Sequence, residues 1–408
     1  MKKQSLLLIV LVILSSCITR NNEKKNSITI LIDFGKQHDT VYITDDVEML
    51  DSSQVDILLS NKVIDSMLIG SIEQVFPTDN GFIFTGTTRQ NNSAGYSNYM
   101  VGKLNPDFSL LNYKKFNIIP SQSAELVNHT LFSLTTDEEQ SIIYEYDINL
   151  DTVYTYKYPN YYNEGSSKLL YSNNLLYIFT TNGYKLRLQS FDINSKKIIT
   201  DNIPDSSGQM IDNVLINKNK FYVISSSILN YNPVPTIFEF NEDQTIASKN
   251  MLIADSLFET RSALFINDSI MLLAGTKYYI GKWNSYSRPS ILITTTRGRI
   301  LKQIDCLYHE YVSNNTGEFI DIKLYKNHFL LLFQSDIDSH GKLLLAKLNS
   351  NTWKIDWLYE LYRSSGRSCN SIYINEKDEI VVFGGEFEGN ADIPQYDHPK
   401  LIKFKILE

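Results

Sequence analysis

Residues Gly81–Thr88 (GFIFTGTT) form a largely apolar run that ends in two threonines and follows a polar Asp-Asn pair. Short apolar runs of this kind, bounded by turn residues, are typical of strands that are buried on both faces. Similar runs recur six more times, at intervals of 45 to 59 residues. They are Thr130–Thr136 (TLFSLTT), 175–181 (LLYIFTT), 220–226 (KFYVISS), 269–275 (SIMLLAG), 328–335 (HFLLLFQS) and 379–385 (EIVVFGG).

Each run belongs to a longer unit. In the first unit, residues 98–104 form a second strand-like segment, a polar turn follows, and residues 110–116 form a third, more polar segment. A short strand-like segment such as residues 71–76 also precedes several of the runs. Seven units of about 50 residues with four strands each predict an all-β fold, a single seven-bladed β-propeller over residues 28–408. Six or eight blades, a long β-sandwich or two all-β domains are the alternatives.

The last unit predicts how the ring closes. The chain ends at Glu408, directly after the third strand of the seventh unit. We therefore expect an N-terminal strand to supply the outer strand of the last blade, with residues 28–34 and 55–59 as the candidates. Such a closure leaves no open sheet edge at the point where the two ends of the fold meet.

Two stretches carry a resemblance to a known kind of protein. Residues 81–116 combine a glycine-containing apolar strand, a Lys-Leu-Asn strand end and a Lys-Phe outer strand, and residues 345–358 (LAKLNSNTWKIDWL) repeat that shape. This resembles a repeat that is common in secreted bacterial β-propellers, and the similarity extends weakly over residues 70–408. The resemblance implies an architecture and no particular activity, because propellers serve many functions.

The first residues predict export and anchoring. Lys2 and Lys3 precede an apolar run over residues 6–14, too short to span a bilayer as a helix. The run ends in Leu-Ser-Ser-Cys17, which resembles the lipobox of bacterial lipoproteins. The resemblance implies a signal peptide over residues 1–16 and a Cys17 that carries the lipid anchor, palmitate included. An ordinary secretory signal with an incidental cysteine is the alternative.

The anchor also predicts where the protein resides. Residues 17–27 are polar and rich in Asn and Lys, as expected for a flexible tether. The protein is then expected in the cell envelope, on the inner or the outer membrane, and facing the periplasm or the exterior.

The binding surface is expected on the loops. In a propeller, the loops between second and third strands share one face with the connections between blades. Here these loops are rich in Tyr, Trp and Arg, the residue types that anchor binding interfaces, and the loop over residues 276–289 contributes most. Packing of these rings against the rim is the alternative. The candidate ligand-binding residues are Tyr278, Tyr279, Trp283, Tyr286, Arg288, Tyr231, Tyr396, His398, Arg89 and Tyr96.

Composition and motifs exclude several functions. The formal net charge of −8 gives no support for nucleic-acid binding. No metal site and no cofactor are expected, because no CxxC pair or phosphate loop occurs. Residues 336–341 (DIDSHG) resemble the start of a calcium loop but lack its later ligands, so we expect a hairpin turn. Asp147, Asn149 and Asp151 are expected as turn residues, and Cys306 and Cys369 as buried free thiols.

These observations predict a non-catalytic function. The expected protein is a membrane-anchored envelope propeller that presents its Tyr/Trp/Arg-rich face to a protein or a glycan. The main alternative is a polysaccharide hydrolase or lyase with paired carboxylates at the mouth of the central channel. A purely structural subunit of an envelope complex is a third possibility. For the enzyme, the candidate carboxylates on the loops are Glu164, Glu310, Asp336, Glu386, Glu388 and Asp392.

Overall fold

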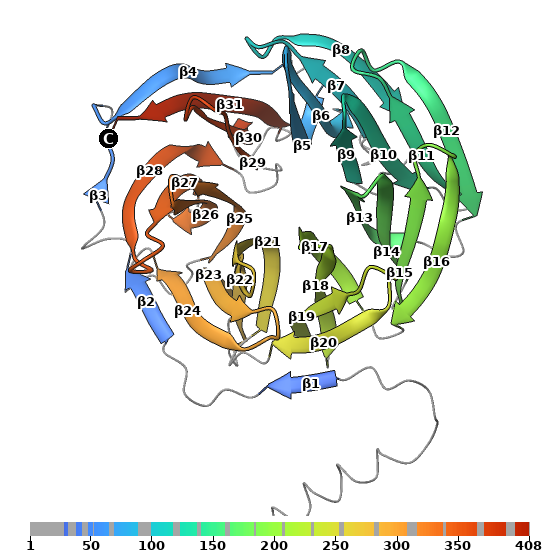
Figure 1. The fold of residues 1–408 in the computed structure, drawn as a ribbon. Coiled ribbons are helices and arrows are strands. Elements are labelled where there is room, and N and C mark those ends of the chain that lie inside the picture. The colour runs from blue at the N-terminus through green and yellow to red at the C-terminus, as the bar shows by residue number, and fades with distance from the viewer. Residues whose placement is uncertain are drawn as a thin grey trace, which may run out of the picture.

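Seven antiparallel sheets stand side by side in a closed ring in the computed structural model (Figure 1). The strands of each sheet follow one another from the centre of the ring outward. This is the predicted seven-bladed β-propeller. The structure describes residues 28–31, 38–42, 48–51, 53–64, 69–88, 99–116, 123–136, 140–159, 164–182, 185–205, 209–229, 232–252, 257–280, 285–307, 316–337, 340–364, 371–388 and 396–407.

The blades are numbered along the chain from residue 69. Blade 1 contains β5 (Ile69–Thr78), β6 (Gly81–Thr88), β7 (Tyr99–Leu104) and β8 (Leu110–Phe116). Blade 2 contains β9 (Ser123–Val127), β10 (Thr130–Thr136), β11 (Gln140–Tyr146) and β12 (Thr152–Pro159). Blade 3 contains β13 (Glu164–Ser172), β14 (Leu175–Asn182), β15 (Lys185–Asp192) and β16 (Lys197–Asp205). Blade 4 contains β17 (Gln209–Asn217), β18 (Lys220–Leu229), β19 (Asn232–Phe240) and β20 (Ile246–Leu252).

The remaining blades have the same order. Blade 5 contains β21 (Leu257–Asn267), β22 (Ile270–Ile280), β23 (Ser285–Thr295) and β24 (Ile300–Leu307). Blade 6 contains β25 (Thr316–Tyr325), β26 (His328–Ile337), β27 (His340–Leu348) and β28 (Ile355–Ser364). Blade 7 contains β29 (Ser371–Ile374), β30 (Ile380–Glu388) and β31 (Tyr396–Ile406), and its fourth strand comes from the start of the fold. The seven apolar runs of the sequence are the second strands of the blades, as predicted.

An N-terminal strand closes the ring, as expected. β4 (Val55–Val63) pairs antiparallel with β31 as the outer strand of blade 7, which confirms the candidate at residues 55–59. The candidate at residues 28–34 was wrong. β1 (Ile28–Leu31) instead adds to the outer edge of blade 4, where it pairs parallel with β20.

Two more short strands extend this arrangement around the ring. β2 (His38–Tyr42) pairs parallel with β24 of blade 5, and β3 (Glu48–Met49) pairs parallel with β28 of blade 6. The chain therefore runs around the outside of three successive blades before β4 closes the seventh (Figure 1). A hydrophobic pattern within such short segments cannot show which edge they will join.

The core consists of seven apolar clusters, one at each contact between neighbouring blades of the described ring. The second and third strands are covered on both faces, and β6 and β7 are buried almost throughout. The outer strand β8 is mostly exposed. This difference explains why the second strands are continuous apolar runs whereas the outer strands contain many polar residues.

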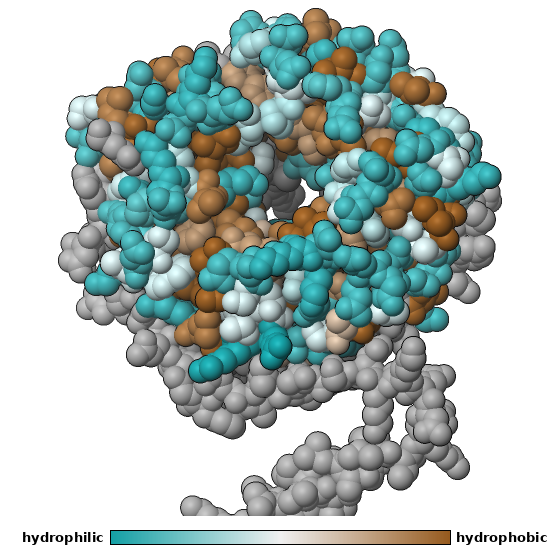
Figure 2. Space-filling view, viewed as in Figure 1, coloured by the Kyte–Doolittle hydropathy of each residue, from teal (hydrophilic) through white to brown (hydrophobic). Residues whose placement is uncertain are grey.

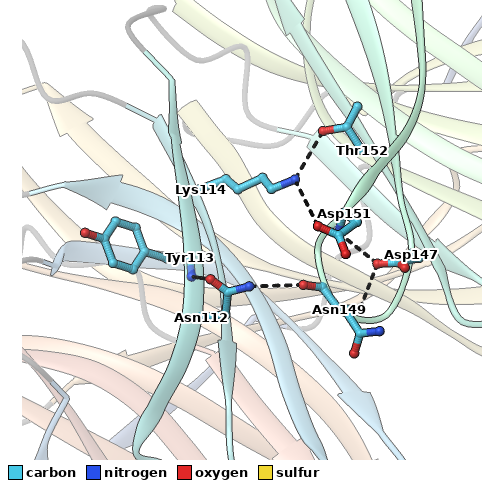
Figure 3. Close-up of polar contacts among 7 residues, drawn as sticks. All are labelled: Asn112, Tyr113, Lys114, Asp147, Asn149, Asp151 and Thr152. Atoms are coloured by element: carbon cyan, nitrogen blue, oxygen red, sulfur yellow. Dashed lines mark hydrogen bonds and ion pairs between the residues drawn. The ribbon is translucent and has the colours of Figure 1, made fainter.

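The polar turns of the outer strands also join neighbouring blades. The Asp147 carboxylate accepts hydrogen bonds from the backbone N–H groups of Asn149 (2.8 Å) and Asp151 (2.8 Å), so these residues form a turn, as predicted. From blade 1, the Asn112 amide donates to the carbonyl oxygen of Asn149 (3.1 Å) and the Lys114 ammonium donates to the Thr152 hydroxyl (3.3 Å) (Figure 3). The turn thus links the outer strands of blades 1 and 2.

The thiol of Cys306 is buried and free in β24, as expected. Burial raises its pKa well above the ordinary value, so it stays protonated and unreactive at neutral pH. Cys369 lies outside the described residues.

Candidate functional site

The order of the strands gives the ring two different ends. The turns between first and second strands, such as Asn128–His129, lie at one end, together with those between third and fourth strands; we call this the turn end. The hairpins between second and third strands lie at the opposite end, which we call the loop end, and β22 and β23 reach it at Ile280 and Ser285. Figure 2 shows an opening at the centre of the ring and a mixture of polar and apolar side chains on the face in view.

The predicted binding residues that the structure describes come from two blades and lie toward the loop end. The described ones lie on β22 and β23 of blade 5 and on β31 of blade 7. Blade 6 separates blade 5 from blade 7, so the described residues do not form one contiguous patch. Tyr278 and Tyr279 lie on β22, Tyr286 and Arg288 on β23, and Tyr396 and His398 on β31. Cys17, Arg89, Tyr96, Tyr231 and Trp283 lie outside the described residues.

The predicted long loop over residues 276–289 was wrong. β22 and β23 are 11 residues each, and they pair through Tyr279 with Tyr286 and Ile280 with Ser285. Only residues 281–284 fall between the two strands. Blade 5 therefore carries an elongated hairpin at the loop end rather than a loop, because the Thr, Tyr and Ser residues there pair as strand residues.

One predicted residue contacts the inner wall of the ring. The Tyr278 hydroxyl donates a hydrogen bond to the Glu259 carboxylate on β21, the innermost strand of blade 5 (2.7 Å). Arg261 on the same strand forms an ion pair with Glu259 (3.2 Å). The base of the elongated hairpin is thus tied to charged groups on the innermost strand.

The innermost strands share a feature that the sequence analysis missed. In six blades, the residue that pairs with the fifth residue of the second strand is polar. The signal in the sequence was a polar residue five or six residues before the first turn of each of these six blades. These residues are Gln74, Ser123, Lys168, Asn213, Ser262 and Asp321.

Several of these side chains bind the backbone of the next blade. Gln74 accepts a hydrogen bond from the N–H of Ala124 (2.9 Å), and Ser123 accepts one from the N–H of Leu169 (2.6 Å). Asp321 accepts hydrogen bonds from Ser262 of blade 5 and from the N–H of Ile372 of blade 7, so it links three blades. Pairing between blades therefore continues along the inner wall through side chains.

A β-bulge lies directly before the shared polar position in four blades. The register shifts at Glu73, Asp212, Arg261 and Ile320, which leaves each of these residues outside the regular pairing. Bulges commonly redirect a side chain near functional sites. Three of the four bulge residues are charged, so the bulges concentrate charge on the innermost strands.

The charged groups of blades 3, 4 and 5 influence one another. Burial raises the pKa of Asp212 to about 7, while a hydrogen bond from Ser226 (2.6 Å) opposes the shift. Glu259 raises the pKa of Asp212 further, and Arg261 and Lys168 lower it. Asp212 therefore exchanges its proton near neutral pH beside a second carboxylate. Pairs of carboxyl groups with shifted pKa values can serve in acid–base catalysis or in binding that depends on pH.

Stability should depend on pH through these carboxyl groups. The pKa of Asp212 is about 7 in the folded protein against an ordinary 3.8, and burial also raises the pKa of Glu73 and of Glu125 to about 7. Between pH 4 and 7 the folded protein then binds more protons than the unfolded chain, so the free energy of unfolding falls as the pH rises.

We expect Asp212→Asn to stabilise the protein at pH 8 by roughly 2–4 kcal/mol and to have little effect at pH 5, because the amide stays neutral in both states. Urea unfolding at the two pH values measures this difference. Asp268→Asn, at an exposed turn of blade 5, is the control. An equal effect of Asp212→Asn at both pH values would contradict the prediction.

A pocket of about 570 Å³ opens at the turn end, opposite the predicted face. The first turns of blades 7, 1 and 2 line it, so it lies where the last blade meets the first. Its size is typical of a small-molecule site. The lining residues are Pro77, Thr78, Asp79, Leu126, Asn128, His129, Tyr373, Asn375, Glu376 and Lys377.

The described residues contain neither a metal-binding cluster nor a membrane-spanning helix. No group of three or more His, Cys, Asp or Glu side chains in that part of the chain is arranged to hold a metal ion. Within the same residues, no helix is long and apolar enough to cross a membrane.

Comparison with known proteins adds little about function. No protein-family model matches the chain, and no curated protein matches it at a significant level. Among solved structures, it is similar to one described as "Structure of Dos1 propeller", with 10% sequence identity and a TM-score of 0.48. That match covers 86% of this chain and 96% of the other. The propeller assignment rests on the strand pairing described above.

Proposed function

We propose that the protein is a lipid-anchored β-propeller of the cell envelope that binds a protein or a glycan at its loop end without catalysing a reaction. The observation that carries this proposal is the elongated β22–β23 hairpin. Its backbone register pairs Tyr279 with Tyr286, next to Tyr278 and Arg288, at the end where β31 begins with Tyr396. Functional residues of rigid scaffolds commonly lie on such projecting segments.

The base of the hairpin supports this role. The Tyr278 hydroxyl is held by Glu259. Lys277 forms a buried ion pair with Asp305 (2.8 Å). The Asp305 carboxylate also accepts a hydrogen bond from the Ser290 hydroxyl (2.9 Å). These contacts fix both strands at their root, so the projecting part starts from a rigid support. A surface that is ordered before it binds loses less conformational entropy on binding.

The proposed anchor rests on the lipobox-like sequence that ends in Cys17. The first described strand begins at Ile28, so residues 17–27 would separate the lipid from the propeller. A tether of this length would hold the propeller close to the membrane surface and leave it free to turn.

A second candidate function is cleavage of a polysaccharide, as a hydrolase or as a lyase. The observation that favours it is the neighbourhood of Asp212, whose pKa burial raises to about 7, and Glu259, a second carboxyl group that raises this pKa further. Glycosidases use a pair of carboxyl groups, one of which has a raised pKa. These residues replace the loop carboxylates considered from the sequence.

The experiment compares cells that express the full-length protein, Cys17→Ala or Trp283→Ala. We expect a fatty-acid probe to label the parent and Trp283→Ala but not Cys17→Ala, which should leave the membrane fraction. For binding, the purified proteins are titrated onto immobilised envelope fragments and onto a glycan array. Trp283→Ala should weaken binding by roughly 1–3 kcal/mol, as loss of a central aromatic anchor does, with little change in melting temperature.

Tyr113→Ala removes an exposed ring in the middle of the outer strand of blade 1, outside the hairpin of blade 5, and should leave binding unchanged. An unlabelled parent protein would disprove the anchor. Unchanged binding by Trp283→Ala, with a large fall in melting temperature, would show that the hairpin is structural. Release of reducing ends from the glycans by the parent, lost in Asp212→Asn, would favour the enzyme.

A further inference from the structure

We propose that the pocket between the first turns of blades 7, 1 and 2 is a second binding site, which takes a short neutral oligosaccharide. This site lies at the turn end and shares no residue with the loop-end surface. The proposal therefore does not depend on the function proposed above. It rests on the fixed geometry of the three turns, on the donors and acceptors that they present, and on the balance of charge.

The turn of blade 2 is rigid. Asn128 and His129 both have positive φ angles, 46° and 65°, and they join β9 to β10 as a two-residue hairpin. This is the backbone of a type I′ turn, whose twist matches that of the strands it connects. The exposed Asn128 and His129 side chains therefore project from a fixed support into the lining of the pocket.

The turn of blade 7 is rigid as well. The Asn375 side-chain oxygen accepts hydrogen bonds from the backbone N–H groups of Lys377 (2.9 Å) and Glu379 (2.9 Å). Its amide group donates to the Glu379 carboxylate (2.6 Å). These bonds fix the backbone that carries Glu376 and Lys377, so the wall of the pocket on this side is formed before any ligand arrives.

One aromatic ring gives the pocket an apolar wall. Tyr373 is half-buried on β29 and packs edge to face on Phe82 of blade 1, with ring centroids 5.4 Å apart. Leu126 and Pro77 add apolar surface from blades 2 and 1. A sugar ring has apolar C–H faces and a polar rim of hydroxyl groups, so it needs both an aromatic or aliphatic surface and a set of hydrogen-bonding groups.

The polar lining matches a ring of hydroxyl groups. The carboxylates of Asp79 and Glu376 only accept hydrogen bonds, the Lys377 ammonium only donates them, and the Asn128 amide does both. Hydroxyl groups can donate and accept, so they suit this mixture. The two carboxylates and the single ammonium leave no excess of positive charge, which disfavours phosphates and acidic sugars and favours a neutral ligand.

The test uses the full-length protein in a detergent without a sugar headgroup, such as an alkylamine oxide. The probes are maltotriose, cellotriose and tri-N-acetylchitotriose, each observed by saturation-transfer NMR and titrated by calorimetry up to about 10 mM, the range of weak sugar affinities. We expect at least one probe to bind the parent. The double variant Asp79→Ala/Glu376→Ala should lower its affinity about tenfold or more, because two charged acceptors are lost.

A matched control lies at the same turn of another blade. Asp268 of blade 5 occupies the position that Asp79 occupies in blade 1, so Asp268→Ala should leave sugar binding unchanged. Tyr373→Phe keeps the ring and its packing on Phe82, and it should bind the probe nearly as well as the parent. The proposal is overturned if none of the three probes binds, or if binding survives in the double variant. Loss of binding in Trp283→Ala alone would also overturn it, because that result would place the sugar at the loop end.

Discussion

A chain that begins at residue 64 is expected to lose cooperative unfolding and to aggregate, with a loss of stability of roughly 5 kcal/mol or more. The truncation removes β4, which pairs with β31 from Val63 opposite Lys400 to Val55 opposite Ile406. Val55 is buried in the apolar cluster between blades 6 and 7. Without β4, the edge of β31 is open and that cluster loses its outer cover. Circular dichroism during heating and light scattering measure the two effects.

A chain that begins at Leu50 is the matched comparison. It lacks β1, β2 and β3 but keeps β4, so blades 4, 5 and 6 still have four antiparallel strands each. Blades 1, 2 and 3 have only four strands among the described residues, which shows that a fifth strand is not needed for a blade. We expect a loss of about 1–3 kcal/mol with unfolding still cooperative. If both truncated chains unfold alike, β4 does not close the ring as the structure indicates.

Asp321→Ala is expected to destabilise the protein by roughly 2–4 kcal/mol, because it removes a buried carboxylate that joins three blades. One oxygen of Asp321 accepts hydrogen bonds from the Ser262 hydroxyl of blade 5 (3.1 Å) and from its neighbour Ile322 (2.8 Å). The other oxygen accepts from the N–H of Ile372 in blade 7 (3.0 Å). The alanine leaves these buried donors without an acceptor.

Denaturant unfolding at pH 7 measures the effect of Asp321→Ala. Asp321→Asn retains one acceptor oxygen and should lose about half as much stability as the alanine. Asp268→Ala removes an exposed carboxylate whose ion pair with Lys218 lies at the surface, so a change below about 0.5 kcal/mol is expected. An effect of Asp321→Ala as small as that of Asp268→Ala would show that the bridge between blades contributes nothing.

The fold was predictable because its second strands are buried on both faces. Segments such as Gly81–Thr88 have the same bounds in the sequence prediction and in the structure, because burial on both faces requires an apolar run that polar turns interrupt. The closing strand was also predictable, because the chain ends after a third strand. The pairing of β1, β2 and β3 was not predictable, since the geometry of the assembled ring determines which outer edge a parallel strand joins.

The candidate sites were less accessible from sequence. Tyr278 was found because aromatic residues stand out, but its partner Glu259 lies on another strand that only the fold brings near. Residues 276–289 were assigned to a loop because they lie between the strand-like runs at residues 269–275 and 290–296, whereas the register continues through Tyr279 and Tyr286. The turn-end pocket is lined by residues that range from position 77 to position 377 in the sequence. They lie together only because blade 7 packs next to blade 1 when the ring closes.

The path of the N-terminal strands has a mechanical consequence. A pull on the N-terminal end would first load β1 on blade 4, then β2 on blade 5 and then β3 on blade 6. Each of these strands has five residues or fewer, so each would detach at a low force and release more chain. Only then would tension reach β4, the longest of the four strands and the one that holds the ring shut. The three short strand pairings would therefore break one after another and relieve the tension before the closing strand of the ring is loaded.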